Sequence, residues 1–486
     1  MNRRFEKTAA PTRGSAELAQ EFKGGFLELL PHPRECFRQL SFEDVYLLLN
    51  IYLIPNIMLG FINPWWFYTG SFDYQVFIFA AALPLLLFKP SRKYHKLPGG
   101  IFLIMLCMFV VFQAFRSSVF LRIPISEIVA CMRYNIWSPL TAFCIVFALS
   151  GRTKAQLNNI IVVVIWLFVV QMCLASLSTL TTYDFFISKR IKDVDFVLSL
   201  EGVRGNTTVY PKSAILFAAV VVLISCIRRE QKWFWISCLA VAMPLLYTMR
   251  SQTVRAVIAV FLAFSLYNIF IKQVFGRVVA AGVILVACAV TVPIIMPGYY
   301  DKVVHKFRLS DETEDFTEIS NYQFRTELIE LALINLNASR NRVWGMGYQR
   351  DYDETKREGY SYVLGADAPI ASVLFCEGHL GALLRILPYA AFLLFSIGVF
   401  FWKTTQYQRF LAIVVISTVS AEAVGWVQTN IITQYTNYFA IFALMYFATL
   451  EDPVRSENSR GGRSLARGRG RSELEGQGNE VIQENV

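Results

Sequence analysis

The chain has 486 residues and a formal net charge of +10; 55% of its residues are hydrophobic and 40 are phenylalanine. With a mean hydropathy of +0.44 it is too apolar to be a string of soluble domains, so the composition predicts a membrane protein. The positive charge does not indicate a nucleic-acid partner, because the basic residues lie in both tails and in short loops.

Twelve apolar runs organise the chain. A bilayer core of ~30 Å needs ~20 apolar residues per helix, and only helices satisfy their own backbone hydrogen bonds in lipid when no alternating strand pattern is present. We therefore expect an all-α polytopic membrane protein with about 12 transmembrane helices. The runs lie at about 43–62, 74–88, 98–115, 127–150, 158–177, 212–227, 232–248, 256–271, 277–297, 368–402, 410–427 and 436–450.

Lysine and arginine are concentrated in every second loop, which assigns those loops to the cytoplasm. Both termini are then predicted to be cytoplasmic. The basic loops are 89–96, 152–154, 228–232, 272–277 and 403–409. The domains that follow are a cytoplasmic tail 1–42, helices one to nine over 43–297 with an outer loop 178–211, a large outer loop 298–367, helices ten to twelve over 368–450, and a disordered cytoplasmic tail 451–486. Within the first tail, Glu17 to Leu30 is either an amphipathic helix on the membrane surface or disordered.

The long polar segment from Pro297 to Arg385 is the predicted working part. It contains a helix-like stretch, Ile319 to Leu336, which can begin at Ser320 or Asn321 because their side chains can cap free backbone N–H groups. The helical spacing of Tyr322, Arg325, Ile329 and Ala332 places them on one face, so the guanidinium projects from the apolar side.

A turn follows, Asn341-Arg-Val-Trp-Gly-Met-Gly347, whose glycines permit conformations closed to other residues. The chain then re-enters the membrane through Asp367 and an apolar helix that ends Gly378-His-Leu-Gly381. An arginine on a loop helix, an Asn-x-x-x-Gly-x-Gly turn and a polar residue opening a helix that ends Gly-x-x-Gly together resemble the outer loop of the O-antigen polymerase and ligase family. The resemblance covers roughly residues 200 to 385. Ligases usually carry His-Asn where this chain has Asp367-Ala368, which favours the polymerase branch.

The resemblance implies a GT-C-like architecture in the bacterial inner membrane. It implies a metal-independent glycosyltransferase, without a cofactor, that polymerises lipid-linked repeat units into O-antigen, capsule or exopolysaccharide at the outer face. The donor would be a glycan on polyprenyl pyrophosphate. Membrane lipids, and proteins that flip the carrier or set the chain length, would be its partners. A ligase acting on a lipid or protein acceptor is the nearest alternative.

Arginine should be sparse at outer membrane boundaries, yet Arg204, Arg250, Arg255 and Arg325 are all expected there. A guanidinium binds phosphate oxygens through two parallel hydrogen bonds, which suits a lipid pyrophosphate. Such a cluster would hold the leaving group and stabilise its charge. Snorkelling to ordinary headgroups is the alternative. Arg255 and Arg325 match arginines of the resembling family, and Arg204 matches approximately. Tyr322 either offers a face on which a sugar ring can stack or anchors the loop at the membrane interface.

Glycosyl transfer also needs a base for the acceptor hydroxyl. Asp367 occupies the place where the resembling ligases carry histidine, so it is the candidate base, although it can equally be an N-cap of the helix that follows. Glu327 and Glu330 are alternative bases or solvent-facing residues. Scattered histidines and unpaired cysteines predict no metal site.

Four charged residues fall inside apolar runs, where each costs ~3 kcal/mol or more. They either pair with neighbouring helices and hold the bundle together, or they serve a substrate. In the second case the chain would be a transporter or lipid flippase with sites in helices four, ten and eleven, although it shows no matching pair of broken helices. The four are Arg133, Glu377, Arg385 and Glu422.

Overall fold

The computed structural model describes residues 25–58, 74–125, 128, 135–181, 213–247, 251–295, 321–348, 369–402, 405–424 and 431–450. Every regular element in these residues is a helix, and the described part of each predicted apolar run contains one helix or two continuous ones. They are α4 (Phe42–Leu48) with η1 (Leu49–Met58), α6 (Tyr74–Ala82) with η3 (Leu83–Leu87), α7 (Gly100–Val119), α9 (Trp137–Ser150), α10 (Lys154–Thr181), α13 (Ala214–Arg228), α14 (Gln231–Tyr247), α15 (Ser251–Leu266) with η5 (Tyr267–Ile271), α16 (Phe275–Ile295), α19 (Pro369–Phe401), α20 (Gln406–Val424) and α21 (Phe439–Thr449).

Four more helices lie between or before the apolar runs: α2 (Phe26–Leu29), α3 (Pro33–Arg38), η4 (Arg92–Lys96) and α18 (Asn321–Ala338). In the described residues, five helical stretches are long and apolar enough to cross a membrane, in α7, α10, α15 with η5, α19 and α20. Shorter apolar helices accompany them. The all-α membrane fold is confirmed at this level. Twelve crossings and a GT-C-like architecture stay predictions.

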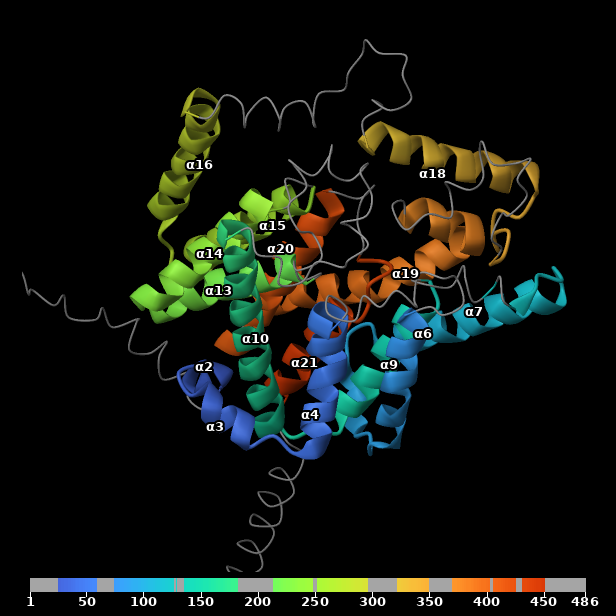
Figure 1. Ribbon diagram of the computed structural model, residues 1–486, viewed down its shortest axis with the longest axis horizontal. Coiled ribbons are helices and arrows are strands. Elements are labelled where there is room, and N and C mark those ends of the chain that lie inside the picture. Colours follow the sequence, from blue (N-terminus) through green and yellow to red (C-terminus); the bar gives the residue numbers. More distant parts are fainter. Residues whose placement is uncertain are drawn as a thin grey trace, which may run out of the picture.

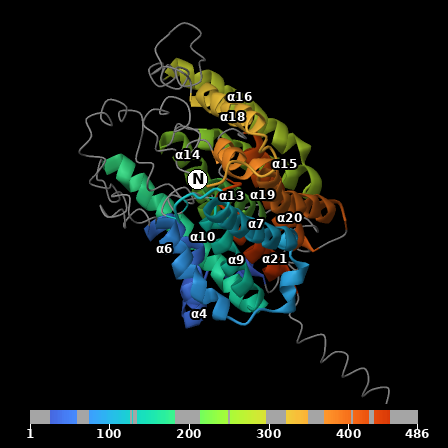
Figure 2. The ribbon, with the colours of Figure 1, turned by 90° about the vertical axis from the view of Figure 1, so that its right-hand side faces the viewer.

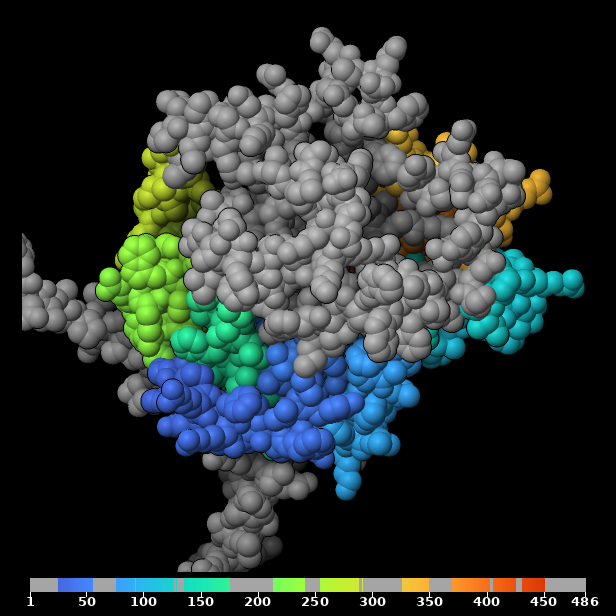
Figure 3. Space-filling model, viewed as in Figure 1, coloured from blue at the N-terminus to red at the C-terminus, as the bar shows by residue number. Residues whose placement is uncertain are grey.

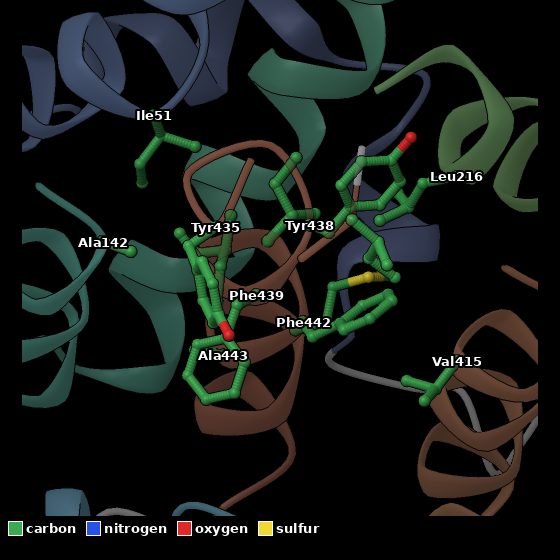
Figure 4. Close-up of a cluster of buried hydrophobic side chains, with 14 of the residues drawn as sticks. Ile51, Ala142, Leu216, Val415, Tyr435, Tyr438, Phe439, Phe442 and Ala443 are labelled. Atoms are coloured by element: carbon green, nitrogen blue, oxygen red, sulfur yellow. The ribbon is translucent and has the colours of Figure 1, made fainter. Parts of the chain in front are cut away.

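The core is centred on α21, which is apolar on every face, the pattern of a helix surrounded by protein. It packs against α9, α10 and α20. Two tyrosines precede it and are almost fully buried. Figure 4 shows Tyr435, Tyr438, Phe439, Phe442 and Ala443 among Val415, Leu216, Ala142 and Ile51.

The predicted cytoplasmic loops contact one another. The Lys93 ammonium donates to the Arg152 carbonyl at 3.2 Å, which joins loops 89–96 and 152–154. The Arg152 guanidinium in turn pairs with Glu43 and lies 3.5 Å from Asp44, both in α4. These contacts place two basic loops beside the start of the first long helix.

The other basic loops reach the same end through the N-terminal segment. Arg228 donates to the Leu27 carbonyl, and the Phe26 ring lies 5.2 Å from the Tyr407 ring. Burial lowers the pKa of Lys272, and the nearby charges of Arg229 and Arg277 lower it further. Four of the basic loops therefore contact the end that α2, α3 and α4 cover, blue in Figure 1 and Figure 3, and Lys272 of the fifth lies near Arg229 of the loop 228–232. This arrangement is consistent with the prediction that every second loop lies on the same side of the membrane. The cytoplasmic location of the termini stays a prediction.

The N-terminal segment is packed onto the bundle from residue 25 onward. Phe26, Leu27 and Leu30 are buried, and the Trp166 indole N–H donates to the Leu30 carbonyl at 2.8 Å. The described part of the predicted tail is thus helical and attached to α10, because its apolar side chains find partners there. Residues 1–24 and the tail 451–486 lie outside the described residues.

The predicted loop helix is present as α18, described from Asn321 to Ala338. In both views it lies at the end away from α4, beside α19 (Figure 1 and Figure 2). Ile329 and Ala332 are buried, as the predicted apolar face requires, together with Leu328 and Leu336. α18 is therefore attached to α19 by a hydrophobic face.

Candidate functional site

The re-entry helix α19 is broken near its beginning. Its 33 residues would make a straight helix of about 50 Å. At Gly378 the backbone leaves the helical conformation, with φ 67° and ψ −167°. Residues 369–377 therefore form a short helix, and residues 379–401 form a longer one of about 35 Å, enough to cross a bilayer core of about 30 Å.

The turn of the outer loop fills this break. Carbonyls at the end of the short helix, Phe375 and Cys376, accept from the N–H groups of Met346 (2.8 Å) and Gly347 (3.1 Å). At the start of the long helix, the His379 and Leu380 N–H groups donate to carbonyls of the turn at 2.9 and 3.2 Å. A broken helix leaves such groups without intrahelical partners, so the turn supplies hydrogen bonds that α19 cannot make itself.

Two glycines make this close approach possible. Gly345 and Gly378 both have positive φ, 70° and 67°. A Cβ on Gly345 would lie 2.5 Å from the Gly378 nitrogen, and a Cβ on Gly378 would collide with the Val343 carbonyl. Gly347 also has positive φ, at 86°, so the conformational freedom predicted for both glycines of the turn is confirmed.

A third segment, the end of α7, joins the turn and the break. The fully buried Gln113 amide donates to the Trp344 carbonyl at 2.7 Å and to the Cys376 carbonyl at 2.6 Å. The Arg116 guanidinium donates to the Trp344 and Gly345 carbonyls at 3.3 and 3.1 Å. α7 begins at the basic end of the bundle, and its other end contacts the turn of the large loop. This agrees with the prediction that the loop after α7 and the large loop lie on the same side, opposite the basic loops.

A buried ion pair contacts the end of the turn. Arg385 Nε donates to Glu377 Oε2 at 2.7 Å, a second bond joins Arg385 Nη2 to Glu377 Oε1, and neither side chain is exposed. Tyr348, at the end of the turn, donates its hydroxyl to Glu377 Oε1 at 2.7 Å. Burial raises the pKa of Tyr348 well above its ordinary value and the Glu377 carboxylate raises it further, so the hydroxyl stays protonated and donates.

Arg385 also ties down distant parts of the chain. Its Nη1 donates to the Ile432 carbonyl at 3.0 Å, its Nη2 donates to the Asn135 carbonyl, and its own carbonyl accepts from the Tyr435 hydroxyl. Glu377 and Arg385 are eight residues apart, about 12 Å along an ideal helix. Because Gly381 between them has no side chain, the Glu377 carboxylate has room beside the helix to reach the Arg385 guanidinium.

A second buried ion pair joins two helices. Arg255 of α15 donates to Glu422 of α20, and the Glu422 carboxylate also accepts from the Tyr438 hydroxyl at 2.7 Å. The two charged side chains are 3% and 1% exposed. Arg255, expected to bind the substrate, thus lies against a carboxylate. For Glu377, Arg385 and Glu422, the predicted pairing is present, with the difference that Glu377 and Arg385 pair with each other.

Most of the remaining predicted site residues lie outside the described part of the chain, and the others belong to α18. Arg204, Arg250, Asp367 and the intramembrane Arg133 lie outside the described residues. Tyr322 and Arg325 belong to the first two turns of α18, and their side chains lie outside the described part. The convergence of Arg204, Arg255, Arg325 and Asp367 therefore stays a prediction. The alternative bases Glu327 and Glu330 are both exposed to solvent on α18.

Sequence reasoning did not identify the part that three residues play in this region: Gln113, Tyr348 and the helix-breaking Gly378. A glutamine in the middle of the run 98–115 is a detectable signal, because an amide in lipid needs partners. In the sequence, Gly378 is recognisable only as part of a Gly-x-x-Gly pattern. Its role depends on a turn more than thirty residues away, which local patterns do not reveal.

The fold defines a class: in its described residues this is an all-helical protein with helices suited to crossing a membrane, and a polar loop element anchored in one broken helix. No group of three histidine, cysteine or acidic side chains in the described ranges is placed to hold a metal ion. No protein-family model matches the chain, and no curated protein matches it.

Proposed function

We propose that this chain is a polysaccharide polymerase of the bacterial inner membrane. It transfers a growing glycan from its polyprenyl pyrophosphate carrier to a hydroxyl of an incoming lipid-linked repeat unit. The bond between the anomeric carbon and the phosphate oxygen breaks, and a new glycosidic bond forms. The acceptor loses a proton to a base, and polyprenyl pyrophosphate leaves. The product is the glycan, one repeat longer, on the second carrier.

The observation that supports this proposal most is the packing of the segment that resembles the polymerase loop. Its helix α18, its glycine turn and the re-entry helix α19 form one packed unit. The arginine-bearing helix and the helix that follows Asp367 therefore hold a fixed relation to each other, which a two-substrate transfer requires.

In the proposal, Arg325 and Arg204 hold the pyrophosphate with Arg250, and Asp367 takes the acceptor proton. Arg255, which is buried against Glu422, is expected to support the site from the start of α15. Tyr322 stacks on a sugar. As the base, Asp367 has to remain deprotonated before the transfer. Nearby arginines favour the charged carboxylate, whereas surroundings of low dielectric constant favour the protonated form.

A transporter is the second candidate, because a discontinuous helix such as α19 is a feature of transporter substrate sites. In transporters the half-helix ends bind substrate or ions. Here the N–H groups of His379 and Leu380 and the carbonyls of Phe375 and Cys376 bind the protein's own turn. Glu377 and Glu422 are also both paired with arginine. These contacts favour structural roles for the buried charges, and therefore favour the polymerase.

The test replaces the native gene by variants in the producing strain and reads the surface glycan on a gel. Arg325→Ala and Asp367→Asn are compared with Arg342→Ala, which removes an exposed arginine from the turn. The two site variants are expected to abolish the ladder of long chains while single repeat units still reach the cell surface. The control is expected to keep the ladder.

Loss of all surface repeats with accumulation of the carrier on the inner side would support transport instead. Long free chains on the carrier that are not passed to their final acceptor would support the ligase reading. An unchanged ladder in both site variants would remove the enzymatic proposal.

A further inference from the structure

The turn at residues 341–348 is held in the break of α19 from three directions. Four backbone hydrogen bonds join it to the two halves of α19, and the Gln113 amide links a carbonyl of the turn to a carbonyl of the short helix. At its end, Tyr348 is anchored twice: its N–H donates to the Ser117 hydroxyl at 2.9 Å, and its own hydroxyl donates to Glu377. We call this arrangement of residues 113–117, 341–348 and 375–380 the junction.

The junction lies between the two elements that carry the proposed catalytic residues. α18, which bears Arg325, ends three residues before Asn341, where the turn begins. Asp367 precedes by two residues the short helix 369–377, whose last carbonyls bind the turn. A change in the junction therefore changes the position of α18 relative to the short helix 369–377. The buried ion pair beneath it provides a fixed point, because Arg385 is bound to segments around residues 135 and 432 as well.

Tyr348 is the residue of the junction that connects the loop to this fixed point by a side chain. It is fully buried, and its hydroxyl meets a carboxylate. Hydrogen bonds to charged groups are the stronger ones, and loss of this one leaves Glu377 Oε1 with Arg385 as its donor but without a bond to the turn. Substitution by phenylalanine removes this single bond and keeps the ring, so it tests the connection without emptying the space.

We propose that Tyr348 is a positioning residue: through Glu377 it fixes the outer turn in the break of α19 and so sets the geometry between Arg325 and Asp367. The catalytic part of this inference depends on the proposed polymerase function, whereas the anchoring of the turn does not. Two measurements separate the parts.

The first measurement is amide hydrogen exchange of the full-length protein in lipid nanodiscs. In Tyr348→Phe, peptides that cover residues 341–348 and 375–382 are expected to exchange about tenfold faster, the equivalent of one lost charged hydrogen bond. The matched control is Tyr446→Phe, which removes a buried tyrosine hydroxyl bonded to the Lys96 carbonyl at 2.6 Å at the basic end of the bundle. The control is expected to leave the junction peptides unchanged.

The second measurement is the rate of polymer formation at varied concentrations of lipid-linked repeat unit. Misplacement of a catalytic group by about 1 Å costs up to about 100-fold in rate. Tyr348→Phe is therefore expected to lower kcat at least about tenfold with KM nearly unchanged, since binding to the arginines is retained. Tyr446→Phe is expected to keep both constants.

Each outcome decides one part. Unchanged exchange in the junction peptides overturns the anchoring role of Tyr348. Faster exchange with unchanged kcat overturns the positioning role and leaves a structural bond. If Tyr348→Phe does not fold, Ser117→Ala, which removes the acceptor of the Tyr348 N–H, tests the anchoring of the turn, with a smaller rise in exchange expected because this bond is neutral. If the wild-type protein makes no polymer, the proposed function fails, and the exchange measurement still decides whether Tyr348 holds the turn.

Discussion

The two buried ion pairs of this protein differ in what they connect. Glu377 and Arg385 belong to one helix, α19, and are shared with Tyr348 of the outer loop and with carbonyls of two other segments. Arg255 and Glu422 connect α15 with α20. Both pairs are nearly inaccessible to solvent. Glu377, Arg385 and Glu422 fall in runs that sequence alone marks as membrane helices, and Arg255 directly precedes such a run.

The difference shows that a charge in an apolar run has no single meaning. A pair between two helices contributes to their packing directly. A pair within one helix contributes by binding third groups, and here those groups bring the loop, the segment before α9 and the segment before α21 to one point. The pair in α19 is therefore expected to be harder to replace than the pair between α15 and α20.

The largest expected effect comes from breaking the α19 pair on one side. Arg385→Met leaves the Glu377 carboxylate buried without its main partner, and such changes cost about 3–5 kcal/mol. The free energy of unfolding, measured by denaturant titration in mixed micelles, is expected to fall by that amount. Unchanged stability would show that Glu377 finds water or another cation, and would contradict the fixed-point role of the pair.

Closing the break in α19 should also be costly. Gly378→Ala places a side chain in a left-handed conformation and against the Val343 carbonyl, which together cost about 2–4 kcal/mol. Gly398→Ala in the same helix is the matched control, because its Cβ would make only ordinary contacts with Trp402. The control is expected to be neutral or slightly stabilising. Equal effects in the same unfolding titration would contradict the account of the break.

The two pairs are compared directly by replacing both partners of each. A hydrophobic replacement of a buried ion pair is often neutral, so Arg255→Met with Glu422→Met is expected to stay within about 1 kcal/mol of the wild type. Glu377→Met with Arg385→Met is expected to lose about 2–4 kcal/mol, because Tyr348 and the carbonyls of Asn135 and Ile432 lose partners. Similar losses for the two double variants would mean that the pairs do not differ as proposed.

The smallest effect is expected for an exposed ion pair that serves as a reference. Glu230 accepts from Lys232 and from Arg228 at 2.8 Å, and these bonds, the one from Lys232 most, lower the pKa of its carboxyl group. Glu230→Gln is expected to cost no more than about 1 kcal/mol. A lowered pKa stabilises the folded state above the ordinary carboxyl pKa, and this contribution disappears as the pH falls through the lowered value. The difference between the free energies of unfolding at neutral pH and near pH 3 should therefore be smaller in Glu230→Gln than in the wild type. A cost above 2 kcal/mol would contradict the exposed-pair reading.

The helices could be predicted from sequence because their signal is local. Each run such as 98–115 carries its apolar pattern within itself, and α7 occupies it with a shift of a few residues at its ends. The same holds for the presence of α18 and for the positive φ of Gly345 and Gly347. These features depend on a few neighbouring residues, so composition and spacing were sufficient.

The junction could not be predicted because its partners are distant in sequence. Gln113 bonds to carbonyls more than two hundred residues away, and Tyr348 finds Glu377 only because the turn enters a broken helix. The sequence predicts partners on neighbouring helices for Glu377 and Arg385, if they do not serve a substrate. The break at Gly378 and the missing side chain at Gly381 allow them to meet each other instead.

The most direct test of the central claim uses purified protein in liposomes with the lipid-linked repeat unit of the source strain as the sole substrate. The account predicts glycan chains of increasing length, with one polyprenyl pyrophosphate released for each new linkage, and neither product with Arg325→Ala. Repeat units that stay single while the carrier crosses the bilayer would contradict it.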